Sequence, residues 1–262
     1  MSSLFTTIFL QPILNLLVFL YNTIPGHDIG ISIILLTVIV KGILYPFTVK
    51  QIRQQRAMQE LQPKIAELQE KYKDQKEEQA RELMALYAKE KVNPVASCLP
   101  LLVQLPIFIA LYRALTFALN SKNLTLLYSF VANPQSINTH FLGFLDLSRP
   151  NYVLAVAAAL IQFWQAKQIM RPPAATIATP PPEVAGSTGA KDESMAAMMN
   201  KQMLYLMPIM TAAIGFTLPG GLTLYWLVMS LLTVLQQWWL LKNMPPRMTA
   251  QLVGTDTTPS SS

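Results

Sequence analysis

Charge is what this 262-residue sequence has least of. Only 13% of the residues are charged, whereas 52% are hydrophobic, and the mean hydropathy is +0.34. An average soluble domain carries about 25% charged residues, so a chain with roughly half that supply cannot cover a surface that faces water. The scarcity excludes an ordinary soluble domain and predicts an integral membrane protein.

Cysteine and metal-ligating clusters are also scarce. Cys98 is the single cysteine, so the chain can form no internal disulfide and has no CxxC motif. His27 and His140 stand alone in the sequence and form no metal-binding pattern. No P-loop pattern occurs, and the apolar runs contain neither a nucleophile beside a base nor a pair of carboxylates. We therefore expect a protein that is not an enzyme and uses neither a cofactor nor a metal.

The charges that do occur are segregated along the chain. No Lys or Arg precedes Lys41, and no charged residue lies between Gln202 and Leu241. By contrast, Lys50–Lys91 holds ten of the twenty basic residues and eight of the fourteen acidic ones. The net charge of +6 therefore indicates basic loops that flank apolar spans, not specific binding to nucleic acid.

Five apolar stretches have about the length of 20 residues that a membrane-spanning helix needs. The fold class predicted is all-α integral membrane, with five transmembrane helices, an interfacial amphipathic helix at the N-terminus and a cytoplasmic helical hairpin. The expected segments are an interfacial helix and loop (1–27), a first span (28–50), the coiled-coil hairpin (51–92), a second span (93–119), an outer loop (120–145), a third span (146–169), a disordered loop (170–200), a fourth span (201–218), a fifth span (221–241) and a cytoplasmic tail (242–262).

The N-terminal segment has an alternative interpretation as a sixth span. It is apolar enough to cross a bilayer, but Gln11, Pro12 and Asn15 interrupt it and no basic residue flanks it. Those features favour a helix that lies in the membrane interface. With five spans, Lys122 and Arg149 are the only basic residues of the outer loops, so the positive-inside rule predicts an outer N-terminus and a cytoplasmic C-terminus.

The charged segment after the first span has the spacing of a coiled coil. Met58, Leu61, Ile65, Leu68 and Tyr72 recur at alternating steps of three and four residues, which places them on one helix face. A polar break follows before the next apolar stripe. The pattern predicts a helical hairpin, and a solvated spacer is its plainest role.

Lys41 is the most informative residue because it interrupts an apolar span. It lies about 13 Å from the cytoplasmic end of that span at 1.5 Å per residue. A Lys near the middle of a bilayer costs about 2.5–3.5 kcal/mol, and no span supplies an acidic partner. We therefore predict that Lys41 faces a water-filled cavity, with a snorkelling or ion-paired lysine as the alternative. Gln104 and Gln162 are candidates to line that cavity, and Thr211 and Thr223 are weaker ones.

Methionines form a second pattern near the fourth span. Met195, Met199, Met203 and Met207 repeat every four residues, and Met210 lies beside them. Because Met is flexible and polarisable, such a stripe suits a surface that binds varied apolar partners. Ordinary packing against lipid or neighbouring helices explains the stripe equally well.

Four stretches resemble the YidC family of membrane protein insertases, in its short form without a large extracytoplasmic domain. They are LLTVIVKGILYPFTVKQ at 35–51, LQPKIAELQEKY at 61–72, KEKVNPVASCLPLLVQLPIFIALYRAL at 89–115 and MPIMTAAIGFTLPGGLTLYWLVMSLLTVLQQWW at 207–239. The third stretch and the YWLV–QQWW pattern are specific to that family, and the resemblance covers nearly the whole chain. It implies a multi-pass protein of the bacterial cytoplasmic (inner) membrane.

The resemblance also implies a mechanism. Members of the family carry a basic residue, most often Arg, in a hydrophilic groove that opens to the cytoplasm and to lipid; Lys41 takes that position here. Gln104, Gln162 and Trp226 match polar positions of the groove. The apolar helix of the substrate is expected to slide along the third and fifth spans and to partition into lipid. From the methionine stripe, Met203, Met207 and Met210 are candidate contacts for it.

The expected partners are nascent membrane proteins and the lipid bilayer, together with a ribosome, the signal recognition particle receptor and a Sec-type translocon. Two other functions remain open at this point. An assembly chaperone for membrane complexes would use the same groove without translocation. A small-solute transporter is disfavoured because the spans lack the acidic relays that coupled transport commonly needs.

Overall fold

The structure, a computed structural model, describes residues 3–93, 99–120, 126–169 and 195–243, and it is mostly helical. The helices are α1 (Ser3–Phe5), a π-helical turn η1 (Thr6–Leu10), α2 (Gln11–Thr23), α3 (Ile29–Ile43), α4 (Tyr45–Glu60), α5 (Gln62–Lys71), α6 (Lys76–Lys89), α7 (Leu99–Asn120), α8 (Tyr152–Ile169), α9 (Met195–Gly215) and α10 (Gly220–Asn243). Two short strands, β1 (His140–Phe141) and β2 (Leu145–Asp146), pair antiparallel.

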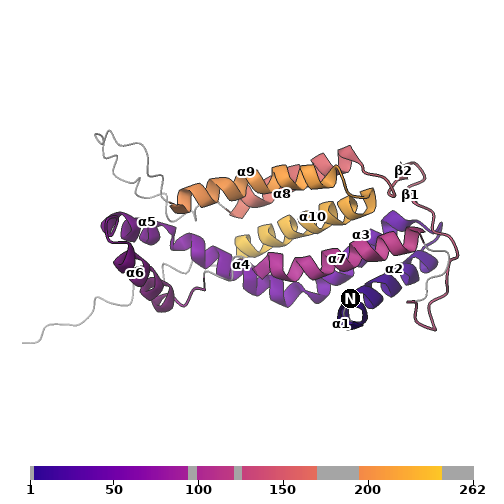
Figure 1. The fold of residues 1–262 in the computed structure, drawn as a ribbon, viewed down its shortest axis with the longest axis horizontal. Coiled ribbons are helices and arrows are strands. Elements are labelled where there is room, and N and C mark those ends of the chain that lie inside the picture. Colours follow the sequence, from indigo (N-terminus) through magenta and orange to yellow (C-terminus); the bar gives the residue numbers. More distant parts are fainter. Residues whose placement is uncertain (1–2, 94–98, 121–125, 170–194, 244–262) are drawn as a thin grey trace, which may run out of the picture.

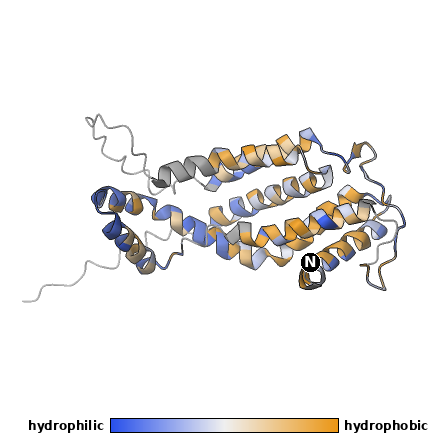
Figure 2. Cartoon of the chain, in the orientation of Figure 1, coloured by the Kyte–Doolittle hydropathy of each residue, from blue (hydrophilic) through white to orange (hydrophobic). Residues whose placement is uncertain are grey.

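Helix α10 lies at the centre of the bundle. It contacts α3, α7 and α8, and α9 packs on α8 (Figure 1). The core between α3, α7 and α10 is apolar and closely packed: Ile33 and Leu222 are fully buried, and Leu115 is 2% exposed. Gly221 allows this close approach, because a Cβ there would lie 3.1 Å from the Ile33 side chain. Figure 2 shows the bundle coloured mainly as hydrophobic.

Several helices are long and apolar enough to cross a membrane. Thr6–Thr23 and Gly220–Asn243 meet that criterion singly, and α3 with α4 meets it as a bent pair. These helices confirm the coarse prediction of a helical membrane protein. The count of five spans and the interfacial position of 1–27 stay predictions, because length and composition alone do not decide them.

The first predicted span, 28–50, is not one straight helix. Its two parts, α3 and α4, meet at an angle of 68° on either side of Leu44. Pro46 lies in the first turn of α4, where it has no N–H to donate and its ring would clash with the carbonyl four residues earlier in a continuous helix. Lys41 therefore lies in the last turn of α3, close to the bend.

The loop that carries β1 and β2 forms hydrogen bonds with the N-terminal ends of both α3 and α10. Asp28 caps α3 by accepting the N–H groups of Gly30 and Ile31, and its second carboxylate oxygen accepts the Leu142 N–H at 2.7 Å. At the start of α10, Gly220 and Gly221 donate their N–H groups to carbonyls of the segment that follows β2. The loop thus joins two helices that are far apart in sequence.

The charged segment forms α5 and α6, which lie side by side beyond the bundle (Figure 1). Ala57, Leu61, Ile65 and Val92 form a small buried core there, and Lys64 pairs with Glu90 at 2.6 Å. This segment is coloured mainly as hydrophilic in Figure 2.

Some predicted segments fall outside the described residues. Residues 170–194 of the predicted loop 170–200 lie outside the described residues, and residues 195–200 belong to α9. Of the predicted tail 242–262, the part beyond Asn243 also lies outside the described residues. The side chain of Met203 also lies outside the described part of the chain.

Candidate functional site

The side chain of Lys41 is buried between α3 and α10. It is 9% exposed, and its Nζ donates a hydrogen bond to Thr233 Oγ1 at 2.9 Å. The Thr233 hydroxyl donates its own proton to the Met229 carbonyl at 2.7 Å, so the oxygen lone pairs remain for Lys41. This bond takes one of the three protons of the ammonium group.

Acidic side chains lie elsewhere in the described part of the chain. No carboxylate there comes within 4.0 Å of Lys41; the ion pairs found join Arg56 to Glu60, Lys64 to Glu90 and Arg149 to Asp146. A neutral hydroxyl offsets only part of the free energy of removing a cation from water. Lys41 can therefore attract an anionic group that enters the bundle.

A second polar contact joins α7 to α10. Gln104 Nε2 donates to the Tyr225 hydroxyl at 2.7 Å, and Tyr225 is 1% exposed. One turn further along α7, the Phe108 ring meets the Trp226 ring edge-on with centroids 5.4 Å apart. Gln104 and Trp226 are thus brought to one helix contact, and α10 carries both this contact and the partner of Lys41.

A stripe along α10 connects these contacts. Its members recur at steps of three and four residues, so they lie on one face of the helix; they are Thr223, Trp226, Ser230, Thr233 and Gln237. We call them the α10 polar face. Trp226 and Thr223 are among the residues predicted from the sequence, and Ser230, Thr233 and Gln237 are not. Their spacing within an uncharged span was a signal that could have identified them.

The α10 polar face ends at a small pocket between α10 and α4. Gln237 lines the pocket opposite Gln55, Arg56 and Gln59. Gln237 is 2% exposed, and its Oε1 has no hydrogen-bond partner in the described structure. A buried amide oxygen without a partner costs about 1–3 kcal/mol, so this end of α10 is suited to a bound water molecule.

Gln162 lies on a different helix pair. Its Oε1 accepts a hydrogen bond from the Thr211 hydroxyl, which joins α8 to α9. The structure therefore does not bring it into the α3–α7–α10 contacts that hold Lys41 and Gln104. On α9, Met207 is 37% exposed and Met210 is 46% exposed, so both contribute to the apolar surface of the bundle.

Comparison with known proteins supplies the family. A family model described as "60Kd inner membrane protein" matches residues 19–247. The membrane protein insertase YidC of Oceanobacillus iheyensis is 34% identical over 93% of this chain and 85% of its own length. The membrane protein insertase YidC of Fusobacterium nucleatum is also 34% identical, over 87% of this chain and 94% of its own length.

A solved structure shares the fold. It is titled "Active YidC insertase crystal structure with the first transmembrane domain resolved" and matches with a TM-score of 0.58 at 24% identity. The match covers 91% of this chain and 47% of the solved chain, so this chain spans about half the length of that protein. The family model and the two close relatives confirm the resemblance found in the sequence: the chain belongs to the YidC family of membrane protein insertases.

Proposed function

We propose that the chain inserts nascent membrane proteins by admitting their hydrophilic segments to a polar groove along α3, α7 and α10. Lys41 is the observation that carries this proposal. It is an ammonium group in an apolar bundle, 9% exposed, whose partner is a hydroxyl and not a carboxylate. A substrate carboxylate that replaces or joins the hydroxyl would offset more of the cost of burying the charge.

The groove lowers the free energy of carrying polar chain into the bilayer. A peptide group that leaves water without a hydrogen-bond partner costs several kcal/mol. The hydroxyl and amide groups of Ser230, Thr233 and Gln237 offer such partners along one face of α10. The substrate's own apolar helix supplies the driving force, because each Å² of apolar surface removed from water contributes about 25 cal/mol.

The apolar helix of the substrate is released on the lipid-exposed side of the bundle. Met207 and Met210 on α9 are partly exposed, as are Leu235 and Trp238 on α10, at 58% and 57%. Flexible Met side chains adapt to helices of different shape. We therefore assign Met207 and Met210 to a surface along which the substrate slides; Met203 is included on its spacing in the sequence alone. Gln162, held by Thr211, is assigned to the margin of the groove.

Charge distribution supports the orientation. The five proposed spans are the bent α3–α4 pair, α7, α8, α9 and α10, with the N-terminus outside and the C-terminus in the cytoplasm. Basic residues then concentrate in the α5–α6 hairpin on the cytoplasmic side. That position suits the hairpin to contact a ribosome, the signal recognition particle receptor or a Sec-type translocon while a substrate is delivered.

The experiment replaces the native insertase in a depletion strain by wild-type chain, Lys41→Arg, Lys41→Ala or Lys41→Glu. Translocation of an acidic outer tail on a single-span reporter is measured by protease protection. We expect wild type and Lys41→Arg to translocate the tail, and Lys41→Ala and Lys41→Glu to fail at equal protein levels. If all four translocate it equally, the assignment of Lys41 is wrong. An assembly chaperone would give a different result: a reporter that is a subunit of a membrane complex would assemble into that complex without exposing its tail to protease.

A further inference from the structure

The turn between β1 and β2 exposes large apolar side chains. Leu142 is 58% exposed and Phe144 is 76% exposed. We call the segment Phe141–Phe144 the hairpin tip. It lies at the end of the molecule where α8 begins and α9 ends (Figure 1). In contact with water these two side chains would be unfavourable.

The backbone of the tip is left-handed at Leu142, a conformation that is unfavourable in free energy for a leucine. Leu142 has φ 52° and Gly143 has φ 80°, and the Phe144 N–H donates to the Phe141 carbonyl at 3.3 Å. Two consecutive positive φ values are typical of the tight hairpin turns in which Asn-Gly is the preferred pair. At position 142 this chain has Leu where Asn would be preferred. The turn is therefore less stable, and it presents an apolar side chain at its apex.

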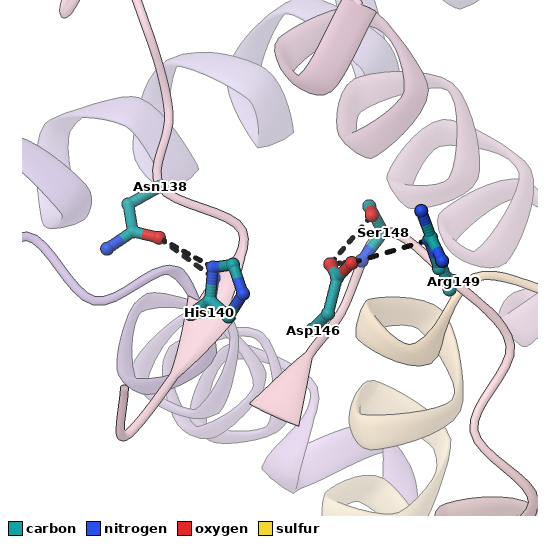
Figure 3. Close-up of polar contacts among 5 residues, drawn as sticks. All are labelled: Asn138, His140, Asp146, Ser148 and Arg149. Carbon is teal, nitrogen blue, oxygen red and sulfur yellow. Dashed lines mark hydrogen bonds and ion pairs between the residues drawn. The ribbon is translucent and has the colours of Figure 1, made fainter. Parts of the chain in front are cut away.

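Polar side chains gather at the base of the same hairpin. His140 pairs across the strands with Asp146, and Asp146 accepts hydrogen bonds from the Ser148 N–H and hydroxyl. Arg149, whose side chain is 85% exposed, reaches Asp146 at 3.7 Å (Figure 3). The side chains therefore change from polar to apolar within two residues along each strand.

Beyond the polar base, the start of α8 also exposes apolar side chains. At the start of α8, Tyr152 is 66% exposed and Val153 is 78% exposed. The Tyr152 ring meets the Phe216 ring of α9 edge-on at 5.3 Å. In a membrane protein family these exposed faces of α8 and α9 meet lipid. Phe144 of the tip is eight residues before Tyr152 in the chain.

We propose that Leu142 and Phe144 of the hairpin tip insert into the lipid of the outer leaflet, with the polar base at the level of the headgroups. An apolar segment flanked by polar and basic groups is the arrangement that binds a membrane interface. The tip is tied to α3 by the bond from the Leu142 N–H to Asp28. The choice of leaflet rests on the proposed orientation, whereas insertion of the tip does not.

The test places an environment-sensitive NBD label on single cysteines in a Cys98→Ser background. Phe144→Cys reports on the tip, and Ser136→Cys, an exposed position in a polar part of the same loop, is the matched control. The full chain is reconstituted in nanodiscs of phosphatidylethanolamine and phosphatidylglycerol that hold one copy each. We expect iodide to quench the label at 144 several-fold less than at 136, and lipids spin-labelled near the headgroup to quench it more.

Equal quenching by iodide at both positions would overturn the proposal, because the tip would then lie in water. Shielding that is present in crowded vesicles but lost at one copy per nanodisc would also overturn it in favour of contact between copies. A membrane-impermeant maleimide applied to spheroplasts tests the orientation separately. If Ser136→Cys reacts only after the spheroplasts are broken open, the loop lies on the cytoplasmic side, and the proposed orientation and choice of leaflet are wrong. The depth measurement still decides whether the tip inserts.

Discussion

The two ends of the contact between α3 and α10 differ in kind. These helices run in the same direction, and at their N-terminal ends Gly30, Ile33 and Gly221 form a closely packed, apolar contact that the 126–151 loop closes. We call this the closed end. At the polar end, Lys41 meets Thr233, and a turn later Gln237 keeps an amide oxygen without a partner.

The difference shows how one helix pair combines a tightly packed apolar contact with polar contacts. Leu and Ile side chains supply the free energy of packing at the closed end, so the polar end can hold groups that stabilise the fold less. The bend at Leu44 lets α4 leave the bundle on the polar side. The proposed groove would open at the polar end and be sealed at the closed end.

Gly30→Ala gives the largest expected loss of stability, because it disrupts the packing at the closed end. A Cβ at this position would lie 2.2 Å from the Phe141 ring, so the loop must move away. We expect a loss of about 3 kcal/mol, at the upper end of the usual cost of overpacking, measured by denaturant unfolding in detergent. In Gly42→Ala, on the same helix, the new Cβ meets nothing within 4 Å. That variant should be as stable as wild type or more stable; equal losses in both would disprove the tight contact.

Thr233→Val tests the polar end with a side chain of similar shape. The variant removes the acceptor of the Lys41 hydrogen bond and leaves a buried ammonium group unpartnered. We expect a loss of about 2 kcal/mol in the free energy of unfolding. The control is Thr217→Val, in the turn after α9, where an exposed hydroxyl donates to the Ile214 carbonyl three residues earlier; its effect should stay within about 0.5 kcal/mol. A loss no larger than that in Thr233→Val would mean that Lys41 does not depend on this acceptor.

The contact between Gln104 and Tyr225 lies between the two ends, and its expected effect is smaller. Gln104→Leu and Tyr225→Phe each remove the same hydrogen bond. Each variant should lose about 1 kcal/mol of stability. The double variant should lose clearly less than the sum, and a double-mutant cycle measures this coupling. Fully additive losses would show that the two side chains act independently.

Asp146, in the loop that covers the closed end, gives the smallest effect. Hydrogen bonds from the Ser148 hydroxyl and N–H lower the pKa of Asp146 below its ordinary value of 3.8. A carboxyl group with a lowered pKa in the folded state contributes stability above its unfolded pKa and loses it as the pH falls through the folded pKa. The difference in stability between wild type and Asp146→Asn should therefore shrink as the pH is lowered below about 4. A difference that does not change with pH would contradict this assignment.

Sequence alone predicts the parts of this molecule that interrupt a simple pattern. Lys41 is visible because a charge breaks an apolar run, and the coiled-coil spacing at Leu61 and Ile65 predicts helices where α4 and α5 lie. The family follows from long, specific stretches. Such signals are strong because each residue type is costly or unusual at its place.

Features that cost little leave little signal. Thr233 and Ser230 are tolerated in any apolar helix because their hydroxyls can bond to the preceding turn, so the pairing of Thr233 with Lys41 is decided by packing. The bend at Leu44 was not predicted, although Pro46 was a signal for it. Strands of two residues, as in β1 and β2, are too short for a periodic pattern. The pairing of Gln162 with Thr211 also depends on how α8 and α9 pack.

The central claim is that Lys41 acts as a cation toward the substrate. Its most direct test is a double-mutant cycle in proteoliposomes that contain the purified chain. Wild type and Lys41→Ala are each combined with a reporter whose outer tail carries either Asp or Asn at the same positions, and rates of translocation are compared. We predict that Lys41→Ala slows the Asp tail about tenfold more than the Asn tail, which corresponds to about 1.4 kcal/mol. Equal slowing of both tails would contradict a role for the charge of Lys41.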